Sequence, residues 1–228
     1  AAVLEYGGPF SQYFESYEHR PEQVEMLKAV TNALSTGNHL MVEAGTGVGK
    51  SFAYLVPAAY FAIQNNTRIV VSTNTINLQD QLIKKDLPNL KAALNLDVRT
   101  AVMKGRSNYL CPRRLDFMRS HGPKDATEMR ILAKILVWMI ENTSGDRNEI
   151  NLTGPTERDA WMRLSAEDDN CTTETCMGRM GGSCPFQRAK QAALNSHILV
   201  VNHALLLSDV ASGSKVLPEY DYVIVDEA

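Results

Sequence analysis

The chain has 228 residues, of which 44% are hydrophobic and 21% charged, and its formal net charge at pH 7 is −3. This composition is typical of a globular protein, and its weak negative charge excludes a uniformly basic coat for nucleic acid. No apolar run reaches the 18 residues expected of a membrane-spanning helix. The first ten residues lack the features of a signal peptide, so we expect a cytoplasmic protein with no membrane partner.

Helical segments alternate with short β-branched runs in chain order. The expected strands are short and bounded by polar residues, as in buried strands of a parallel sheet. Alternation of this kind implies right-handed crossovers and an α/β fold with a mostly parallel sheet. The expected strands are 39–42, 68–72, 98–102, 198–201 and 222–225, and helices are expected at 20–34, 51–63 and 75–87.

The alternation breaks between Lys104 and Lys190, where the chain holds all its cysteines and a long apolar helix near 126–141. We interpret this stretch as an insertion in the α/β domain. The expected organisation is therefore 1–103 as the first part of that domain, 104–190 as a largely helical insertion, and 191–228 as its second part.

The sequence AGTGVGKS predicts a phosphate-binding loop that leads from a strand into a helix. Such a loop directs backbone N–H groups and a helix N-terminus at an anion, and its glycines permit the backbone conformations that this requires. Lys50 would reach the β- and γ-phosphates of ATP, and Ser51 would ligate Mg²⁺. The alternative is a glycine-rich turn. The loop comprises Ala44, Gly45, Thr46, Gly47, Val48, Gly49, Lys50 and Ser51.

An acidic pair follows the last expected strand. Residues 223–225 predict a buried strand that delivers Asp226 and Glu227 at its carboxyl end, where parallel sheets bind ligands. Asp226 would hold Mg²⁺, and Glu227 would orient and deprotonate the attacking water. Alone, such a pair is commonly the start of a solvated loop. Together with the phosphate loop it predicts nucleotide hydrolysis, with Lys50, Asp226 and Glu227 as the catalytic residues.

Four cysteines, spaced C-x59-C-x4-C-x7-C, predict a metal site. Disulfides are disfavoured in the cytoplasm, and ordinary buried cysteines would not explain why three of the four lie within 14 residues. Four thiolates suit an iron–sulfur cluster and a tetrahedral zinc ion equally, although the absence of a C-x2-C pair argues against the common zinc ribbons. The cysteines are Cys111, Cys171, Cys176 and Cys184.

Residues 104–119 contain five cationic side chains and one carboxylate. Such a stretch would neutralise DNA phosphates, or it would form the solvated face of a helix. The sequence leaves both interpretations open.

Six motifs follow one another along the chain: YEHRPEQ, EAGTGVGKSFAYL, STNTINLQDQL, KGRSNYLC, ILVVNHALLL and VIVDEA. In this order they make the chain similar to the DinG/XPD family of superfamily 2 iron–sulfur DNA helicases. The resemblance extends from about Tyr17 to the end of the chain. It implies a RecA-like P-loop motor domain with an inserted iron–sulfur domain. The family usually completes the last motif as DEAH, so we expect this chain to be a fragment of a longer helicase.

The same resemblance implies roles for individual residues. Arg20 and Gln23 would recognise adenine, and the four cysteines would bind a 4Fe–4S cluster. The residues implied or expected to contact DNA are Thr73, Asn74, Lys104, Arg106, Tyr109 and Arg113.

We therefore expect a monomeric ATP-dependent helicase that uses ATP, Mg²⁺ and a 4Fe–4S cluster. It would translocate on single-stranded DNA and unwind forked or duplex DNA in repair or replication. Two alternatives remain: a DNA-binding or redox-sensing iron–sulfur module with an idle motor, and a nucleotide-dependent nuclease.

Overall fold

The computed structural model describes residues 2–227 except 46, 143, 168–170, 173, 175 and 177–183. The chain divides into two compact units, Ala1–Met103 with Ala192–Ala228, and Lys104–Gln191. The first break lies at the expected boundary and the second lies one residue after it. No helix in the described ranges is long and apolar enough to cross a membrane.

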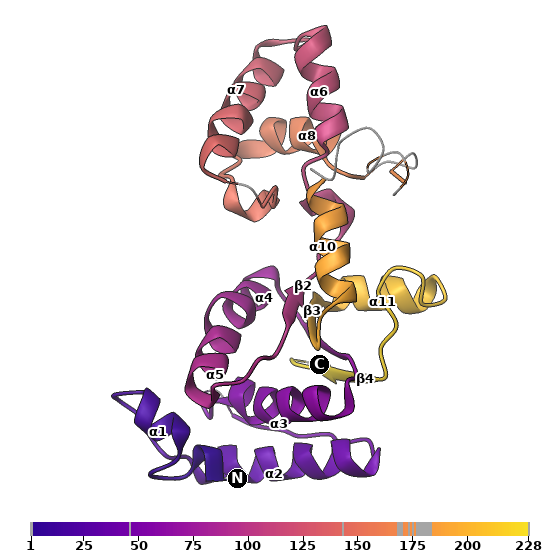
Figure 1. The fold of residues 1–228 in the computed structure, drawn as a ribbon. Coiled ribbons are helices and arrows are strands. Elements are labelled where there is room, and N and C mark those ends of the chain that lie inside the picture. The colour runs from indigo at the N-terminus through magenta and orange to yellow at the C-terminus, as the bar shows by residue number, and fades with distance from the viewer. Residues whose placement is uncertain are drawn as a thin grey trace. The chain divides into compact units, whose positions relative to one another are not determined.

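The first unit contains a parallel four-stranded sheet with the strand order β2-β3-β1-β4 (Figure 1). All five residues of β1 are buried, as the apolar run at 69–71 predicts for a strand inside a parallel sheet. Together with the surrounding helices, this sheet is a RecA-like α/β arrangement. The strands are β1 (Ile69–Thr73), β2 (Thr100–Val102), β3 (Ile198–Asn202) and β4 (Tyr222–Val225).

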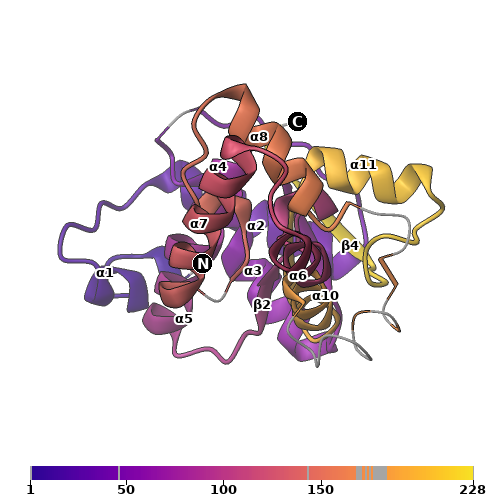
Figure 2. The ribbon, with the colours of Figure 1, turned by 90° about the horizontal axis from the view of Figure 1, so that it is seen from above.

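Helices α2 and α3 form the main helical layer of this unit (Figure 1). Pro21 starts α2 at a position where its missing N–H costs nothing, and Gly37 ends it in the left-handed conformation. On the sheet, α11 packs against β3 and β1. Figure 2 shows α11 from above, on the same side of the view as β4. The helices are η1 (Ala2–Leu4), α1 (Pro9–Tyr13), α2 (Pro21–Thr36), α3 (Lys50–Asn65), α4 (Ile76–Gln81), η2 (Leu82–Asp86), α5 (Leu87–Leu94) and α11 (His203–Ala211).

Two strand expectations differ from the structure. Residues 39–42 are not a strand, and Leu40, Met41 and Val42 are 45%, 97% and 40% exposed. A strand needs a hydrogen-bonded neighbour, and none of the described strands pairs with this segment. β4 is also not fully buried, because it is the edge strand and packs against α3 through Tyr222 and Ile224 only.

The second unit is largely helical and has its own core. Trp161, Ile131 and Ile135 are completely buried in it. The expected helix at 126–141 is confirmed as α7, which begins where the Asp125 carboxylate accepts hydrogen bonds from two backbone N–H groups. The helices are η3 (Arg106–Asn108), α6 (Pro112–His121), α7 (Ala126–Glu141), η4 (Arg147–Glu149), α8 (Gly154–Leu164) and α10 (Pro185–Leu194), which ends in the first unit.

Candidate functional site

The glycine-rich loop enters the N-terminus of α3. Gly47 and Gly49 both have φ of +83°, a conformation that side chains rarely adopt. Gly49 is the N-cap residue, so Lys50 and Ser51 occupy the first turn of the helix. The free N–H groups of this turn, together with the lysine ammonium, favour an anion. Thr46, which the sequence assigns to the loop, lies outside the described residues.

Two side chains near the start of α2 contact this loop. The Arg20 guanidinium donates to the Gly47 carbonyl at 2.5 Å, and the Gln23 amide donates to the Gly49 carbonyl at 2.7 Å. A Cβ atom at Gly49 would lie 2.2 Å from the Gln23 amide nitrogen. The resemblance assigned these two residues to adenine. In this structure they bond to the loop itself and so hold its backbone.

The acidic pair lies at the carboxyl end of β4. The Asp226 backbone N–H donates to the Ser72 carbonyl at 2.8 Å, which continues the pairing with β1. Its carboxylate accepts a hydrogen bond of 2.9 Å from the Tyr54 hydroxyl of α3. Burial raises the pKa of Tyr54, and the Asp226 charge raises it further, so the phenol stays protonated and remains a donor. The bond joins the acidic strand to the helix that the glycine-rich loop begins.

Glu227 is exposed and has φ of +62°, which is uncommon for a residue with a side chain. Its carbonyl lies 3.4 Å from Nε2 of His203, and Nδ1 of the same ring lies 2.7 Å from the Ser72 hydroxyl. His203 thus links the ends of β1 and β4.

A second carboxyl group lies near Ser51. Asp86 is 5% exposed and ends η2, a short stretch with π-helical geometry. Burial raises the pKa of Asp86, while hydrogen bonds from Gln81 and Ser51 partly lower it. Sequence reasoning missed both Asp86 and Tyr54. Tyr54 had one signal, because it lies four residues after Lys50 and therefore on the same side of the helix.

The four cysteines are free thiols, and each is at least 91% buried. Burial raises the pKa of Cys171, and the thiols of Cys184 and Cys111 are close enough to raise it further. Burial raises the pKa of Cys176 to about 12, and Cys184 and Cys171 contribute. The thiols therefore interact with one another. Among the residues that the structure describes, no three His, Cys, Asp or Glu side chains form a group that could hold a metal ion.

Comparison with known proteins is consistent with this geometry. The family model described as DEAD/DEAH box helicase matches residues 20–121. The chain is 36% identical over 234 residues to the ATP-dependent DNA helicase YoaA of Haemophilus influenzae. It is 39% identical over 228 residues to the ATP-dependent helicase DinG of Mycobacterium tuberculosis, and 34% identical over 218 residues to the 3'-5' exonuclease DinG of Bacillus subtilis.

The DinG and YoaA proteins are homologues of this chain. The three alignments cover 100%, 92% and 96% of the chain, but only 35%, 34% and 23% of those proteins, in the order given above. The chain thus spans about a third of the length of two of these curated relatives and about a quarter of the third.

Two residues that the resemblance assigns to DNA contact follow β1. Thr73 is completely buried, and its hydroxyl donates to the Thr75 carbonyl at 3.2 Å. Asn74 is exposed at the carboxyl end of the sheet. Only Asn74 of this pair presents its side chain to solvent.

The structure differs from the expectation that Lys104 and Tyr109 face DNA. Lys104 is 2% exposed, and its ammonium lies 2.5 Å from the Asp146 carboxylate. Tyr109 is 5% exposed, and its hydroxyl accepts a hydrogen bond from the Lys104 backbone N–H. Both side chains are used inside the second unit. Arg106 lies 5.4 Å from the Phe186 ring centroid, and Arg113 lines a pocket described below.

Proposed function

We propose that this chain is the nucleotide-binding part of an ATP-dependent DNA helicase. The observation that carries the proposal is the Tyr54–Asp226 hydrogen bond, which ties the acidic pair to the helix that the glycine-rich loop begins. Lys50 would neutralise the phosphates of ATP, while Ser51 and Asp226 would hold Mg²⁺. Glu227 would orient and deprotonate the attacking water.

The remaining roles follow from the same proposal. Arg20 and Gln23 would keep the loop open for phosphate by holding its carbonyls. Single-stranded DNA and forked or duplex DNA are the proposed partners, and Asn74 is a proposed contact to the single strand. The proposed acting form is a cytoplasmic monomer in DNA repair or replication.

Substitution of Lys50 tests this proposal. In the whole protein, Lys50→Ala should reduce DNA-stimulated ATP hydrolysis about 100-fold or more, because the charge that neutralises the phosphates in the transition state is lost. A 100-fold loss corresponds to about 2.7 kcal/mol of transition-state stabilisation, at 1.36 kcal/mol per factor of ten. Glu227→Gln should retain bound ATP without turnover. Lys28→Ala, on the exposed side of α2, is the matched control. Turnover in Lys50→Ala equal to that of the control would contradict the nucleotide site.

We also infer that Cys111, Cys171, Cys176 and Cys184 hold a 4Fe–4S cluster. Their burial and mutual interaction as free thiols support this inference. Four cysteine thiolates are the usual ligands of such a cluster. When bound, it would cross-link distant parts of the insertion and stabilise it against loop entropy.

Colour and metal analysis test the cluster directly. Protein purified without oxygen should be brown and contain about four irons per chain. Cys171→Ser should bleach it and leave nucleotide binding intact. Colourless protein with stoichiometric zinc would contradict the cluster, and thiols that titrate freely in metal-free protein would contradict any metal site.

The two alternative functions make different predictions. The B. subtilis relative is named as an exonuclease, but the chain covers only 23% of that protein. An ATP-driven motor is the better supported function, because the side chains that it needs follow the N-terminus of α3 and the carboxyl end of β4. An idle motor would show no difference between Lys50→Ala and the parent protein.

A further inference from the structure

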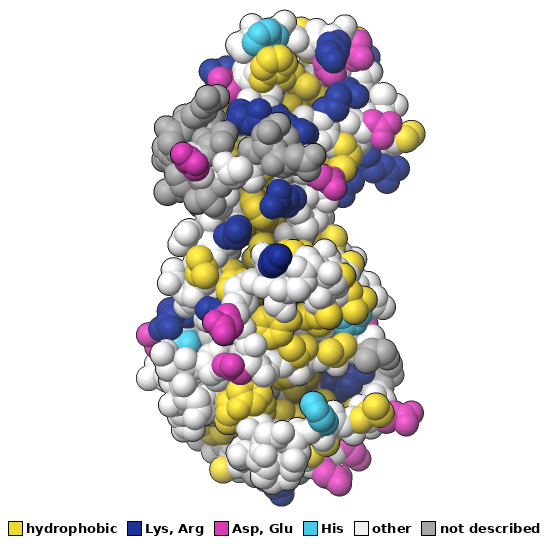
Figure 3. All heavy atoms as spheres, turned by 90° about the vertical axis from the view of Figure 1, so that its right-hand side faces the viewer, with side chains coloured by type: hydrophobic (Ala, Val, Ile, Leu, Met, Phe, Trp, Pro, Cys, Tyr) yellow, Lys and Arg dark blue, Asp and Glu magenta, His cyan; other side chains and the backbone are white. Residues whose placement is uncertain are grey.

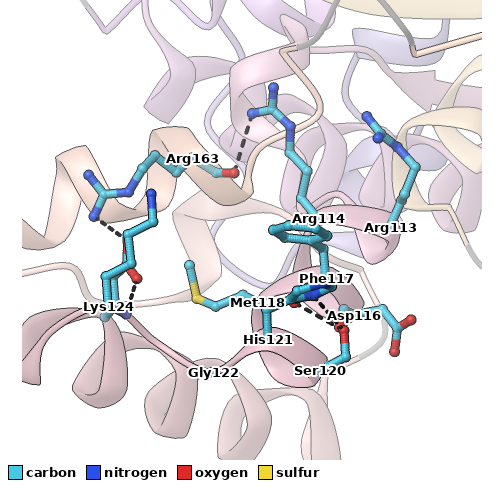
Figure 4. A pocket seen from close by; sticks show the side chains of 11 residues that line it. Arg113, Arg114, Asp116, Phe117, Met118, Ser120, His121, Gly122, Lys124 and Arg163 are labelled. Carbon is cyan, nitrogen blue, oxygen red and sulfur yellow. Dashed lines mark hydrogen bonds and ion pairs between the residues drawn. The ribbon is translucent and has the colours of Figure 1, made fainter.

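A pocket of about 860 Å³ lies in the second unit, beside α6. This volume is in the range of ordinary ligand sites. Figure 4 shows two rings in the pocket with cationic side chains around them, and Figure 3 shows Lys and Arg side chains interspersed with hydrophobic ones on the surface of the molecule. The residues that line the pocket include Arg113, Arg114, Phe117, His121, Lys124 and Arg163.

One face of α6 supplies a cation and both rings. Arg113, Phe117 and His121 are spaced four residues apart, so they follow one another along the same side of the helix. The Phe117 and His121 ring centroids are 4.0 Å apart with an interplanar angle of 22°. Phe117 is nevertheless 62% exposed. An exposed stacked pair is a platform on which another flat ring can stack.

Two of the other cations, Arg114 and Arg163, are held in place by the protein. The Arg114 guanidinium donates to the carbonyls of Met162 and Arg163 at 3.2 and 3.3 Å. Arg163 pairs with Glu128 at 3.0 Å, and Glu128 also accepts from the Lys124 backbone N–H. Because these groups are already ordered, a ligand would pay little entropy to fix them.

The charge of the pocket favours an anion. Its wall has four Lys and Arg side chains and two carboxylates, which belong to Asp116 and Glu128. Among the described residues the Lys124 ammonium has no hydrogen-bond or ion-pair partner, and the side chain is exposed. A ligand that fits this wall carries a negative group next to a flat ring, which is the chemistry of a nucleoside phosphate.

We propose that this pocket binds a nucleotide of single-stranded DNA, with its base on the Phe117–His121 platform and its phosphates near Arg113 and Lys124. The proposal rests on the proposed function, because it names the part of the insertion that would contact the strand. A strand presents bases and phosphates in alternation, so it would use the rings and the cations together.

Binding of a labelled oligothymidylate to the whole protein tests the pocket. Phe117→Ala should weaken binding about tenfold, because one stacked base is lost, and Phe117→Trp should retain it. Arg113→Ala and Lys124→Ala should each reduce the slope of log affinity against log salt by about 1. Arg119→Ala is the matched control, since Arg119 is on α6 but pairs with Asp116 and does not line the pocket.

Ligand variants separate the possible sources of the nucleotide. An oligomer lacking bases should bind Phe117→Ala and the parent equally, and thymidine monophosphate should compete only at concentrations far above those of the oligomer. Competition by free monophosphate at equal nucleotide concentration would overturn the strand assignment. Unchanged oligomer affinity in Phe117→Ala and Lys124→Ala would overturn the pocket, whereas absence of nucleotide binding at Lys50 would count against the proposed function alone.

Discussion

The proposed nucleotide site and the pocket beside α6 are built from contacts of different range. Tyr54 and Asp226 are 172 residues apart in the sequence, and only the sheet brings them within hydrogen-bond distance. Phe117 and His121 lie one turn apart on a single helix. The first site therefore depends on the fold of the whole first unit. The second depends on one helix and the few charged contacts that hold its surroundings.

The largest expected effect is a loss of stability confined to the second unit. Asp146→Asn removes a carboxylate that pairs with the buried Lys104 ammonium, which should cost about 3 kcal/mol of unfolding free energy. Asparagine can still accept the hydrogen bond from the Asn148 backbone N–H that Asp146 accepts. Hydrogen exchange should show lost protection within 104–191 and unchanged protection in β1 and β3.

A double variant serves as the control for this charge effect. Lys104→Met combined with Asp146→Asn removes the buried charge as well, so most of the lost stability should return. An equal loss in the single and double variants would show that packing, rather than charge, explains the result.

The next prediction concerns the long-range bond of the nucleotide site. Tyr54→Phe removes a hydrogen bond to a carboxylate, worth about 1.5 kcal/mol or more, so the Mg²⁺ concentration needed for half-maximal ATP hydrolysis should rise about tenfold. Tyr60→Phe, on the same helix, should behave as the parent protein. An unchanged Mg²⁺ requirement in Tyr54→Phe would mean that Asp226 needs no such support.

Two glycine substitutions measure how the loop is held. Gly47→Ala and Gly49→Ala both force alanine into a left-handed conformation, at a cost of about 1–2 kcal/mol. Gly49→Ala should weaken ATP binding more, since its Cβ would also meet the Gln23 amide, while nothing lies within 4 Å at Gly47. Adding Gln23→Ala should narrow the gap between the two variants. Equal effects of both substitutions would argue against a bracing role for Gln23.

The smallest effect is a pH dependence at Asp86. Burial raises its pKa in the folded state, so the folded protein binds the proton more tightly than the unfolded chain. The free energy of unfolding should therefore fall as pH rises above about 4, the ordinary pKa of aspartate. Asp86→Asn should be the more stable protein at pH 7, with the difference shrinking towards pH 4. Urea unfolding at several pH values measures this dependence. A free energy of unfolding that rises with pH would mean that the neighbours of Asp86 stabilise its carboxylate more than burial destabilises it.

Local sequence patterns predicted the features of the fold and of the candidate site that neighbouring residues build. The loop that enters α3, the strand before Asp226 and the helix at 126–141 all have signals within about 16 residues. The chain's homology to DinG and YoaA proteins also followed from such motifs in their order.

Other features were out of reach because they depend on contacts between distant segments. Burial of Asp86 near Ser51 and pairing of Lys104 with Asp146 require the tertiary packing, and a basic stretch gives no sign of which cation turns inward. The apolar run at 39–42 was assigned as a strand on its composition, but strand formation depends on a neighbour that the run itself does not specify.

The outer edge of β4 has a consequence for how this chain behaves in solution. Among the described strands it has one neighbour only, so its other row of backbone N–H and C=O groups is a template for a further strand. Val223 and Val225 add exposed apolar surface beside it. In a pair of chains related by a two-fold axis, the β4 edge of one copy would pair with the β4 edge of the other and satisfy these groups. Concentrated solutions should therefore contain some dimers beside the monomer that we propose as the acting form, and light scattering should show the dimer proportion falling on dilution.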